Sequence, residues 1–154
     1  MKKIYQIVML CAMSFALVGC SSSTENNSET NYEVDYKEAC EQGNFKEAYI
    51  IVDRLKKEML DFESDNGYEL GNHYDRYVTK LKILKQKYED ARHYVILRET
   101  SYLLEHNGLD ALPQIAFTVK ENDASWVYKD LISIAISLGD EELEQRLRKL
   151  SDID

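Results

Sequence analysis

Residues 45–62 read FKEAYIIVDRLKKEMLDF, and the spacing of their apolar side chains decides the fold class. The apolar positions follow one another after three or four residues, at Phe45, Ala48, Val52, Leu55, Met59 and Phe62. An α-helix turns once in about 3.6 residues, so side chains at this spacing lie on one face. The stretch therefore predicts an amphipathic helix with this face against a core.

A turn and a shorter helix precede this stretch. Residues 32–42 predict a helix that ends at Gly43, because glycine readily adopts the left-handed conformation that closes a helix. Asn44 is expected to cap the next helix with its side chain. The two segments together predict an antiparallel helical hairpin.

The remainder of the chain also predicts helices. Neither glycine nor proline occurs from residue 74 to residue 107, and a helical stripe runs through Tyr74, Val78, Leu81, Leu84, Tyr88, Ala91 and Val95. Either one unusually long helix or two helices with a break at residues 88–90 fit this stripe. Shorter helices are predicted at residues 109–120, with Pro113 in the first turn, at residues 126–138 after a Ser125 cap, and beyond Gly139, where Leu143, Leu147 and Leu150 share a face.

The composition agrees with an all-α protein that has a single helical domain at residues 32–154. The chain has 154 residues, of which 44% are hydrophobic and 31% are charged, with one proline and six glycines. So few chain breakers favour long helices over short strands joined by turns.

The N-terminus carries the features of a secreted precursor. Lys2 and Lys3 precede an uncharged, largely apolar run that extends to Val18, which is typical of a signal peptide. A membrane-spanning helix needs about 20 apolar residues, so this run is too short to remain as an anchor. The sequence Leu17-Val18-Gly19-Cys20 at its end resembles the bacterial lipobox.

The resemblance to the lipobox implies that the precursor consists of a signal peptide, a lipidated tether and the helical domain. Cleavage between Gly19 and Cys20 removes a signal peptide of residues 1–19, and acyl chains such as palmitate on Cys20 attach the product to a membrane. Residues 20–31 then form the lipidated cysteine and a flexible tether, since residues 21–31 hold no apolar side chain that could join a core. The expected location is the cell envelope. The outer membrane is favoured in a Gram-negative host, because Ser21 rather than aspartate follows the cysteine.

The hairpin sequence Gln42-Gly43-Asn44-Phe45-Lys46-Glu47-Ala48 resembles the middle of a tetratricopeptide repeat. In that family glycine closes one helix, and a small alanine lets the two helices pack closely. Leu138-Gly139-Asp140 repeats the turn with Leu143 in place of the alanine, and Tyr88-Glu89-Asp90-Ala91 echoes it without a glycine. These segments depart from the family's period of about 34 residues. The resemblance implies antiparallel hairpins in a short, degenerate right-handed array, with an irregular bundle as the alternative.

The lipobox and this hairpin together are similar to small helical lipoproteins of Bacteroides-type bacteria. The resemblance covers most of the chain after residue 20 and implies a location and a fold, but no activity.

Charge and cysteine usage limit the partners. The net charge is −9, and removal of Lys2 and Lys3 with the signal leaves 17 basic and 28 acidic residues, a net charge of −11. Such a surface repels nucleic-acid phosphates and anionic lipid headgroups, so neither nucleic acid nor electrostatic membrane docking is expected. Cys11 leaves with the signal and Cys20 is acylated, so Cys40 has no partner for an internal disulfide. Its position in a predicted helix favours a small core residue over a reactive thiol.

Metal, cofactor and catalytic sites are not predicted. His73, His93 and His106 are too far apart for the i, i+4 pair of helical zinc sites. Residues 61–67 superficially resemble a calcium loop, but the glycine falls one position late and Asn72 stands at the place of the closing glutamate, so a solvated helix end is expected. The chain contains no phosphate loop, nucleophile elbow or Cys-x-x-Cys motif, so an enzyme such as a hydrolase is the least favoured class.

Tyrosine is the residue type that suggests a contact surface. The chain holds eleven tyrosines, and the central and late helices carry Tyr68, Tyr74, Tyr77, Tyr88, Tyr94, Tyr102 and Tyr128. Tyrosine offers a rigid contact face and a hydroxyl, which suit protein interfaces and sugar-stacking surfaces. The alternative, which we favour, is that these side chains fill half-buried seams between helices.

These features predict a non-catalytic protein-binding or scaffolding lipoprotein of the cell envelope. Its expected partners are the membrane, through lipid on Cys20, and a protein. The alternative is a lipid-anchored inhibitor or immunity protein, whose acidic surface covers a basic enzyme or toxin.

Overall fold

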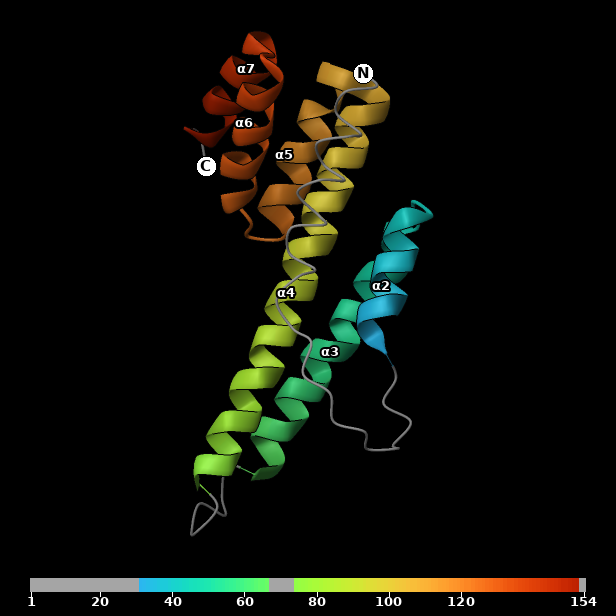
Figure 1. The fold of residues 1–154 in the computed structure, drawn as a ribbon, viewed down its shortest axis with the longest axis vertical. Coiled ribbons are helices and arrows are strands. Elements are labelled where there is room, and N and C mark those ends of the chain that lie inside the picture. The colour runs from blue at the N-terminus through green and yellow to red at the C-terminus, as the bar shows by residue number, and fades with distance from the viewer. Residues whose placement is uncertain (1–30, 67–73, 153–154) are drawn as a thin grey trace. The chain divides into compact units, whose positions relative to one another are not determined.

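The protein is all-α. The computed structural model describes residues 31–66 and 74–152, and within these ranges it contains helices and no strand. The helices in chain order are α2 (Tyr32–Glu41), α3 (Phe45–Asn66), α4 (Tyr74–Asn107), the 3₁₀ helix η2 (Gly108–Ala111), α5 (Leu112–Glu121), α6 (Trp126–Leu138) and α7 (Glu141–Ser151) (Figure 1).

The helical part of the chain divides into two compact units. Among the described residues, the N-terminal unit comprises residues 31–66 and 74–99, and the C-terminal unit comprises residues 100–152. Each unit has buried apolar side chains of its own.

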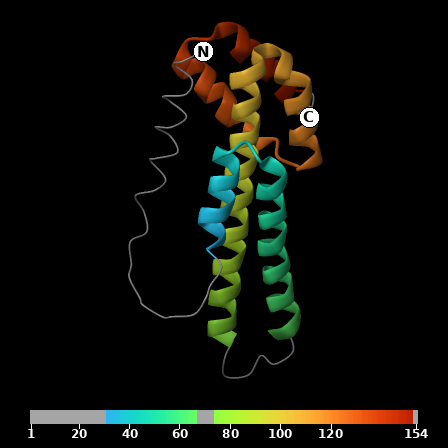
Figure 2. The same ribbon diagram turned by 90° about the vertical axis from the view of Figure 1, so that its right-hand side faces the viewer.

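In the N-terminal unit, α2 and α3 form the predicted hairpin, and Figure 2 shows α2 running beside α3. Gly43 has a φ of 70°, so it takes the left-handed conformation that closes α2. The Asn44 side chain accepts a hydrogen bond from the Glu47 amide at 3.4 Å, which confirms the predicted cap. The predicted hairpin is therefore correct in its ends and in its turn.

The apolar face of α3 packs as its spacing predicts. Ala48, Val52, Leu55 and Met59 are buried, and Phe45 and Phe62 are half-buried at the ends of the same stripe. The buried cluster of the N-terminal unit also takes side chains from α2 and α4: Tyr36, Ala39, Cys40, Ala91 and Val95. Three helices therefore contribute to one core.

Helix α4 resolves the alternative left open for residues 74–107, because it is one uninterrupted helix of 34 residues. At 1.5 Å per residue its length is about 50 Å. The segment Tyr88–Ala91 lies inside this helix, so its likeness to the repeat turn does not correspond to a turn in the structure. No residue there supplies the left-handed conformation, and the Gln86 side chain instead donates to Asp90 one turn later at 2.8 Å.

The C-terminal unit corrects two helix starts. The helix predicted from residue 109 begins at Leu112, after the 3₁₀ turn of η2, so Pro113 does lie in the first turn as expected. Ser125 occupies the N-cap position of α6, but its side chain makes no capping hydrogen bond. Its backbone is already helical, with φ −55° and ψ −24°, and the predicted cap needs an extended residue there.

Helices α6 and α7 form a second hairpin around Gly139, as predicted. Leu143 and Leu147 of α7 are buried and Leu150 is half-buried. Asp140 caps α7 by accepting a hydrogen bond from the Leu143 amide at 3.0 Å.

Three turns share one backbone pattern, and their left-handed residues are Gly43, Asp123 and Gly139, with φ of 70°, 47° and 67°. The next amide donates to the carbonyl five positions earlier, at 2.8, 2.9 and 3.0 Å respectively. The left-handed residue itself donates to the carbonyl three positions earlier, at 3.0, 3.2 and 3.0 Å. This is the Schellman arrangement, which satisfies carbonyls that the helix end leaves open. The turn at Asp123 is closed without glycine, and it was not predicted.

Candidate interaction surface

The tyrosines of the N-terminal unit differ in exposure. Tyr68 lies outside the described residues. Tyr74 is 54% exposed, at the start of α4, whereas Tyr88 and Tyr94 are half-buried and pack against the buried cluster. Tyr77 is also half-buried, and its ring stacks on Phe62 with centroids 5.5 Å apart and planes 17° apart.

The two predicted tyrosines of the C-terminal unit also differ. Tyr102 is 37% exposed and stacks on His106 at a centroid distance of 3.9 Å. Tyr128 is 1% exposed and belongs to the core. A fully buried ring cannot offer a contact face, so Tyr128 fills the core and the proposed interface does not include it.

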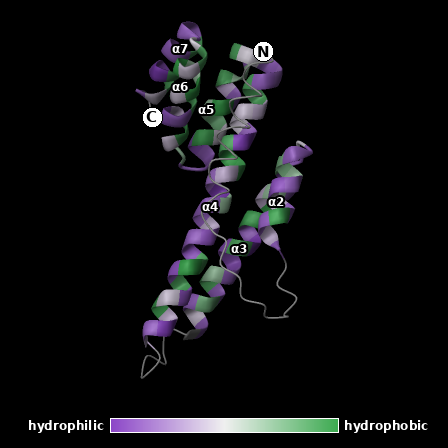
Figure 3. Cartoon of the chain, viewed as in Figure 1, coloured by the Kyte–Doolittle hydropathy of each residue, from purple (hydrophilic) through white to green (hydrophobic). Residues whose placement is uncertain are grey.

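A basic surface lies on the first half of α4. Residues 76–88 hold five basic residues and no acidic residue: Arg76, Lys80, Lys82, Lys85 and Lys87. All five are exposed, and two aliphatic side chains between them, Val78 and Ile83, are 41% and 51% exposed. We call residues 76–88 the basic segment of α4. Figure 3 shows hydrophilic and hydrophobic residues alternating along this helix.

Two contacts join the basic segment to α3. The Lys80 ammonium lies over the Phe62 ring, 4.9 Å from its centroid, and so covers the stacked pair of Phe62 and Tyr77. The Lys85 ammonium lies 3.9 Å from Glu63, and both side chains are about half exposed. Exposed ion pairs of this kind contribute little to stability, so the basic charge is not explained by the fold alone.

Within the N-terminal unit, helix α2 packs against α4 around residues 91–95. The Tyr36 and Tyr94 rings have centroids 5.6 Å apart, and the Lys37 ammonium lies 5.6 Å from the Tyr94 centroid. Burial raises the pKa of the Tyr36 and Tyr94 hydroxyls above the usual range, so both remain neutral at physiological pH. Here α4 has an apolar and aromatic contact with a neighbouring helix.

No family model, curated protein or solved structure matches the chain.

Cys40 is a core residue, as expected. It is 1% exposed, and burial raises the pKa of its thiol to about 12, although the nearby Arg98 guanidinium lowers it. A thiolate is the reactive form of cysteine, so this side chain is inert in the folded protein.

One polar contact lies beside Cys40. The Tyr49 hydroxyl donates to the Glu99 carboxylate at 2.7 Å, joining α3 to α4. Burial and this hydrogen bond raise the pKa of the Tyr49 hydroxyl. This hydrogen bond therefore has a structural role, because it links α3 to α4.

Two of the three histidines lie within the described residues. His93 and His106 are exposed, and the latter shares a 2.8 Å hydrogen bond with the Tyr102 carbonyl. His73 lies outside the described residues. Where the structure describes the chain, no group of three or more His, Cys, Asp and Glu side chains converges as a metal site requires.

The acidic stretch at the end of α3 is a solvated helix end, as predicted. Asp61, Glu63 and Asp65 are helical and exposed, and Gly67 lies outside the described residues.

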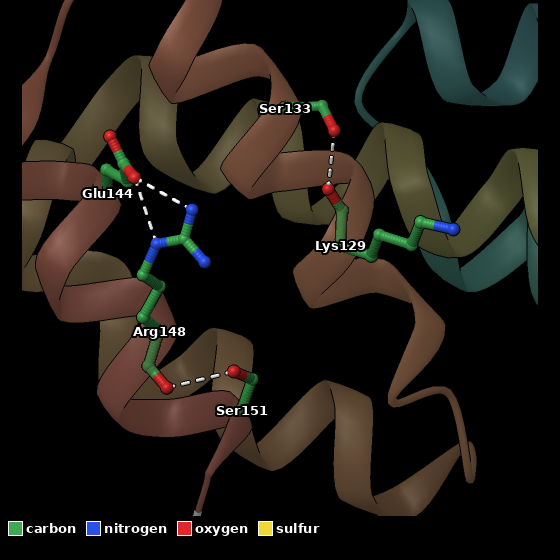
Figure 4. Close-up of polar contacts among 5 residues, drawn as sticks. All are labelled: Lys129, Ser133, Glu144, Arg148 and Ser151. Atoms are coloured by element: carbon green, nitrogen blue, oxygen red, sulfur yellow. Dashed lines mark hydrogen bonds and ion pairs between the residues drawn. The ribbon is translucent and has the colours of Figure 1, made fainter.

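Several serine hydroxyls are occupied by their own helices. Ser133 and Ser137 donate to carbonyls four residues earlier, and Ser151 donates to the Arg148 carbonyl at 2.9 Å. Figure 4 shows two of these bonds, together with the ion pair of Glu144 and Arg148 on α7. Such hydroxyls are held as backbone partners rather than presented to a base.

Among the helices of the described ranges, none combines the length and the apolar character that are needed to cross a bilayer.

Sequence reasoning missed the basic segment because it used the net charge of the whole chain. A count of charges along short windows would have found it, since residues 76–88 carry only basic charges within an acidic protein.

Proposed function

We propose that this protein is a lipid-anchored, non-catalytic module that binds another protein in the cell envelope. The observation that carries the proposal is the order of features at the N-terminus: two lysines, an uncharged apolar run, Leu17-Val18-Gly19-Cys20, and a polar segment. This order is typical of lipoprotein precursors. Acylation at Cys20 would hold the helical units at a membrane surface without any need for a basic patch.

Support for protein binding comes from apolar side chains on the surface of each unit. In the N-terminal unit, Val78 and Ile83 are exposed among the lysines of the basic segment. In the C-terminal unit, Phe117 of α5 is 65% exposed and Ile136 of α6 is 53% exposed. Residues of this size stabilise a complex when a partner covers them, by roughly 25 cal/mol per Å² of apolar area.

The anchor is tested with Cys20→Ser and with metabolic labelling by an alkyne fatty acid. The unaltered protein is expected to take up label and to fractionate with the envelope, and the variant is expected to do neither. Ser21→Ala is the matched control, because it changes the neighbouring residue and leaves the thiol. An unlabelled wild-type protein, or a variant that still fractionates with the envelope, would contradict the anchor.

Protein binding is tested by cross-linking in intact cells that carry the anchored protein. A partner that is recovered repeatedly with the wild type, and is lost when Ile83→Ser or Phe117→Ser is introduced, supports the proposal. Recovery of the same proteins from cells that carry an unrelated lipoprotein of similar charge would count against it.

A second candidate function is inhibition of a basic enzyme. The C-terminal unit favours it, because residues 100–152 contain ten acidic and five basic side chains. Opposite charge accelerates association and makes it salt-dependent. The test uses egg-white lysozyme, a basic hydrolase, as the probe. This function is favoured if the protein binds lysozyme, if the binding weakens strongly with salt, and if it is lost in the double variant Glu141→Lys with Glu142→Lys. Binding that is unaffected by salt and by this double substitution would exclude the inhibitor function.

A further inference from the structure

The face of α4 that receives α2 continues beyond α2. Figures 1 and 2 both show α3 and α4 extending past the N-terminal end of α2 within the N-terminal unit. The contact between Tyr36 and Tyr94 marks the face of α4 on which α2 lies. Seven residues are close to two helical turns, so Lys87 and Lys80 lie on nearly the same face, two and four turns before Tyr94.

This continuing face carries exposed basic and apolar side chains next to one another. Ile83 lies between Lys80 and Lys87, one turn from each, and is 51% exposed. On the side of Lys80 that faces α3, the half-buried rings of Phe62 and Tyr77 stack, and the Lys80 ammonium lies over the Phe62 ring. We call these five residues the extension face.

Helix α2 shows which chemistry packs on this side of α4. It carries the acidic residues Glu33, Asp35, Glu38 and Glu41 and the single basic residue Lys37, and it presents Tyr36, Ala39 and Cys40 to the core. An acidic amphipathic helix therefore already packs on the α3–α4 pair. The extension face carries Lys80 and Lys87 on either side of Ile83, so its charge is opposite to that of α2.

We propose that the extension face binds an acidic amphipathic helix of a partner protein, which packs on α3 and α4 in line with α2. The apolar side of the partner would cover Ile83, and its carboxylates would meet Lys80 and Lys87. A helix laid into a groove between helices is a common mode of protein recognition. This inference rests on the proposed protein-binding function and names its surface and the class of its ligand.

A flat anionic membrane is the competing occupant. The helical partner is favoured because α2 occupies the adjoining part of the same face. The exposed apolar surface between the two lysines is a single isoleucine side chain, which offers a bilayer little to insert.

The test uses the full chain without its signal and a synthetic helical peptide of residues 31–42 as the probe. A second peptide carries glutamine or asparagine at its acidic positions. We expect the acidic peptide to bind with an affinity that falls as salt rises, and the neutral peptide to bind about tenfold more weakly. Equal binding of the two peptides would overturn the proposal.

Variants then locate the site. Lys80→Glu with Lys87→Glu is expected to weaken the acidic peptide about tenfold, and Ile83→Ser is expected to weaken both peptides. Lys120→Glu with Lys149→Glu is the matched control, because it makes the same charge change at exposed positions of the C-terminal unit. Peptide binding that survives the first double variant would place the probe elsewhere, for example at α2's own position, and would refute the inference.

Two further outcomes separate this inference from its alternatives and from the proposed function. In the first outcome, the protein binds vesicles that contain anionic lipid, loses this binding in Lys80→Glu with Lys87→Glu, and binds neither peptide. This result would assign the extension face to a membrane and refute the proposal of a helical partner. A cellular partner whose cross-linking is unaffected by this double variant would leave the proposed function intact and would overturn only the extension face. Circular dichroism of each variant establishes that the fold is retained, as expected for exposed positions.

Discussion

Replacement of Gly139 by alanine tests the physical account of the hairpin turns. Gly139 has a φ of 67°, and a Cβ atom built on it meets no other atom within 4 Å. The cost is therefore conformational rather than steric. The left-handed conformation costs a residue with a Cβ roughly 1–2 kcal/mol, and alanine recovers part of this because it restricts the unfolded chain. We expect a net loss of about 1 kcal/mol in the free energy of unfolding.

The assay is urea unfolding followed by circular dichroism, with Ser133→Ala as a control on the exposed side of α6. Gly139→Asn is expected to lose less than Gly139→Ala, because asparagine tolerates the left-handed region. Asp123 has a φ of 47° in the corresponding turn between α5 and α6, so Asp123→Gly is expected to stabilise by about 0.5 kcal/mol. A Gly139→Ala protein as stable as the wild type would refute the reasoning for both turns.

Three other predictions follow from named contacts. Cys40 should resist thiol reagents in the native state and react when urea unfolds α2 and α3. Because burial raises the pKa of its thiol to about 12, its contribution to stability is complete below pH 9 and is lost as the pH rises toward 12. Urea titrations between pH 9 and 10, below the range in which the buried tyrosines begin to contribute, should show a slope of about 1.4 kcal/mol per pH unit that Cys40→Ala reduces. Asp140→Ala should cost about 1 kcal/mol, measured by urea unfolding, because α7 loses its N-cap, whereas Asp140→Asn should cost little. Tyr49→Phe should cost about 1 kcal/mol in thermal unfolding, since the Glu99 carboxylate loses a part-buried donor, and a Glu99→Gln background should reduce that loss.

The sequence was sufficient where local chemistry decides the structure. The period of apolar residues in 45–62 predicted both the helix α3 and its buried face, and Gly43 and Gly139 predicted two turns because few other residues adopt the left-handed conformation. The cap at Asn44 followed from the same local logic. These features depend on neighbours within one or two helical turns.

The sequence was insufficient where the outcome depends on longer-range packing or on small energy differences. Residues 74–107 contain no chain breaker, so the local sequence does not distinguish one helix of 34 residues from two shorter helices. The single helix α4 could therefore not be predicted. Asp123 closes a turn for which glycine would be expected, and Ser125 is taken into a helical conformation by the turn before it. Which tyrosines are buried and which are exposed also depends on which helices pack against one another.

The candidate surface shows a different limit. Net charge averages over the whole chain, whereas a partner meets only the few side chains within a Debye length of about 8 Å. The five basic residues of residues 76–88 were therefore hidden by acidic residues elsewhere in the chain.

The separation of charge in the N-terminal unit has an electrical consequence. Its α2 carries four acidic residues against one lysine, whereas the basic segment of α4 carries five basic residues and no acidic one. A body with its charges separated in this way has a dipole moment, and a dipole in the field of a charged surface is turned as well as pushed. Near an anionic layer the unit should spend most of its time with the basic segment toward that layer, and added salt should randomise its orientation before it changes its distance.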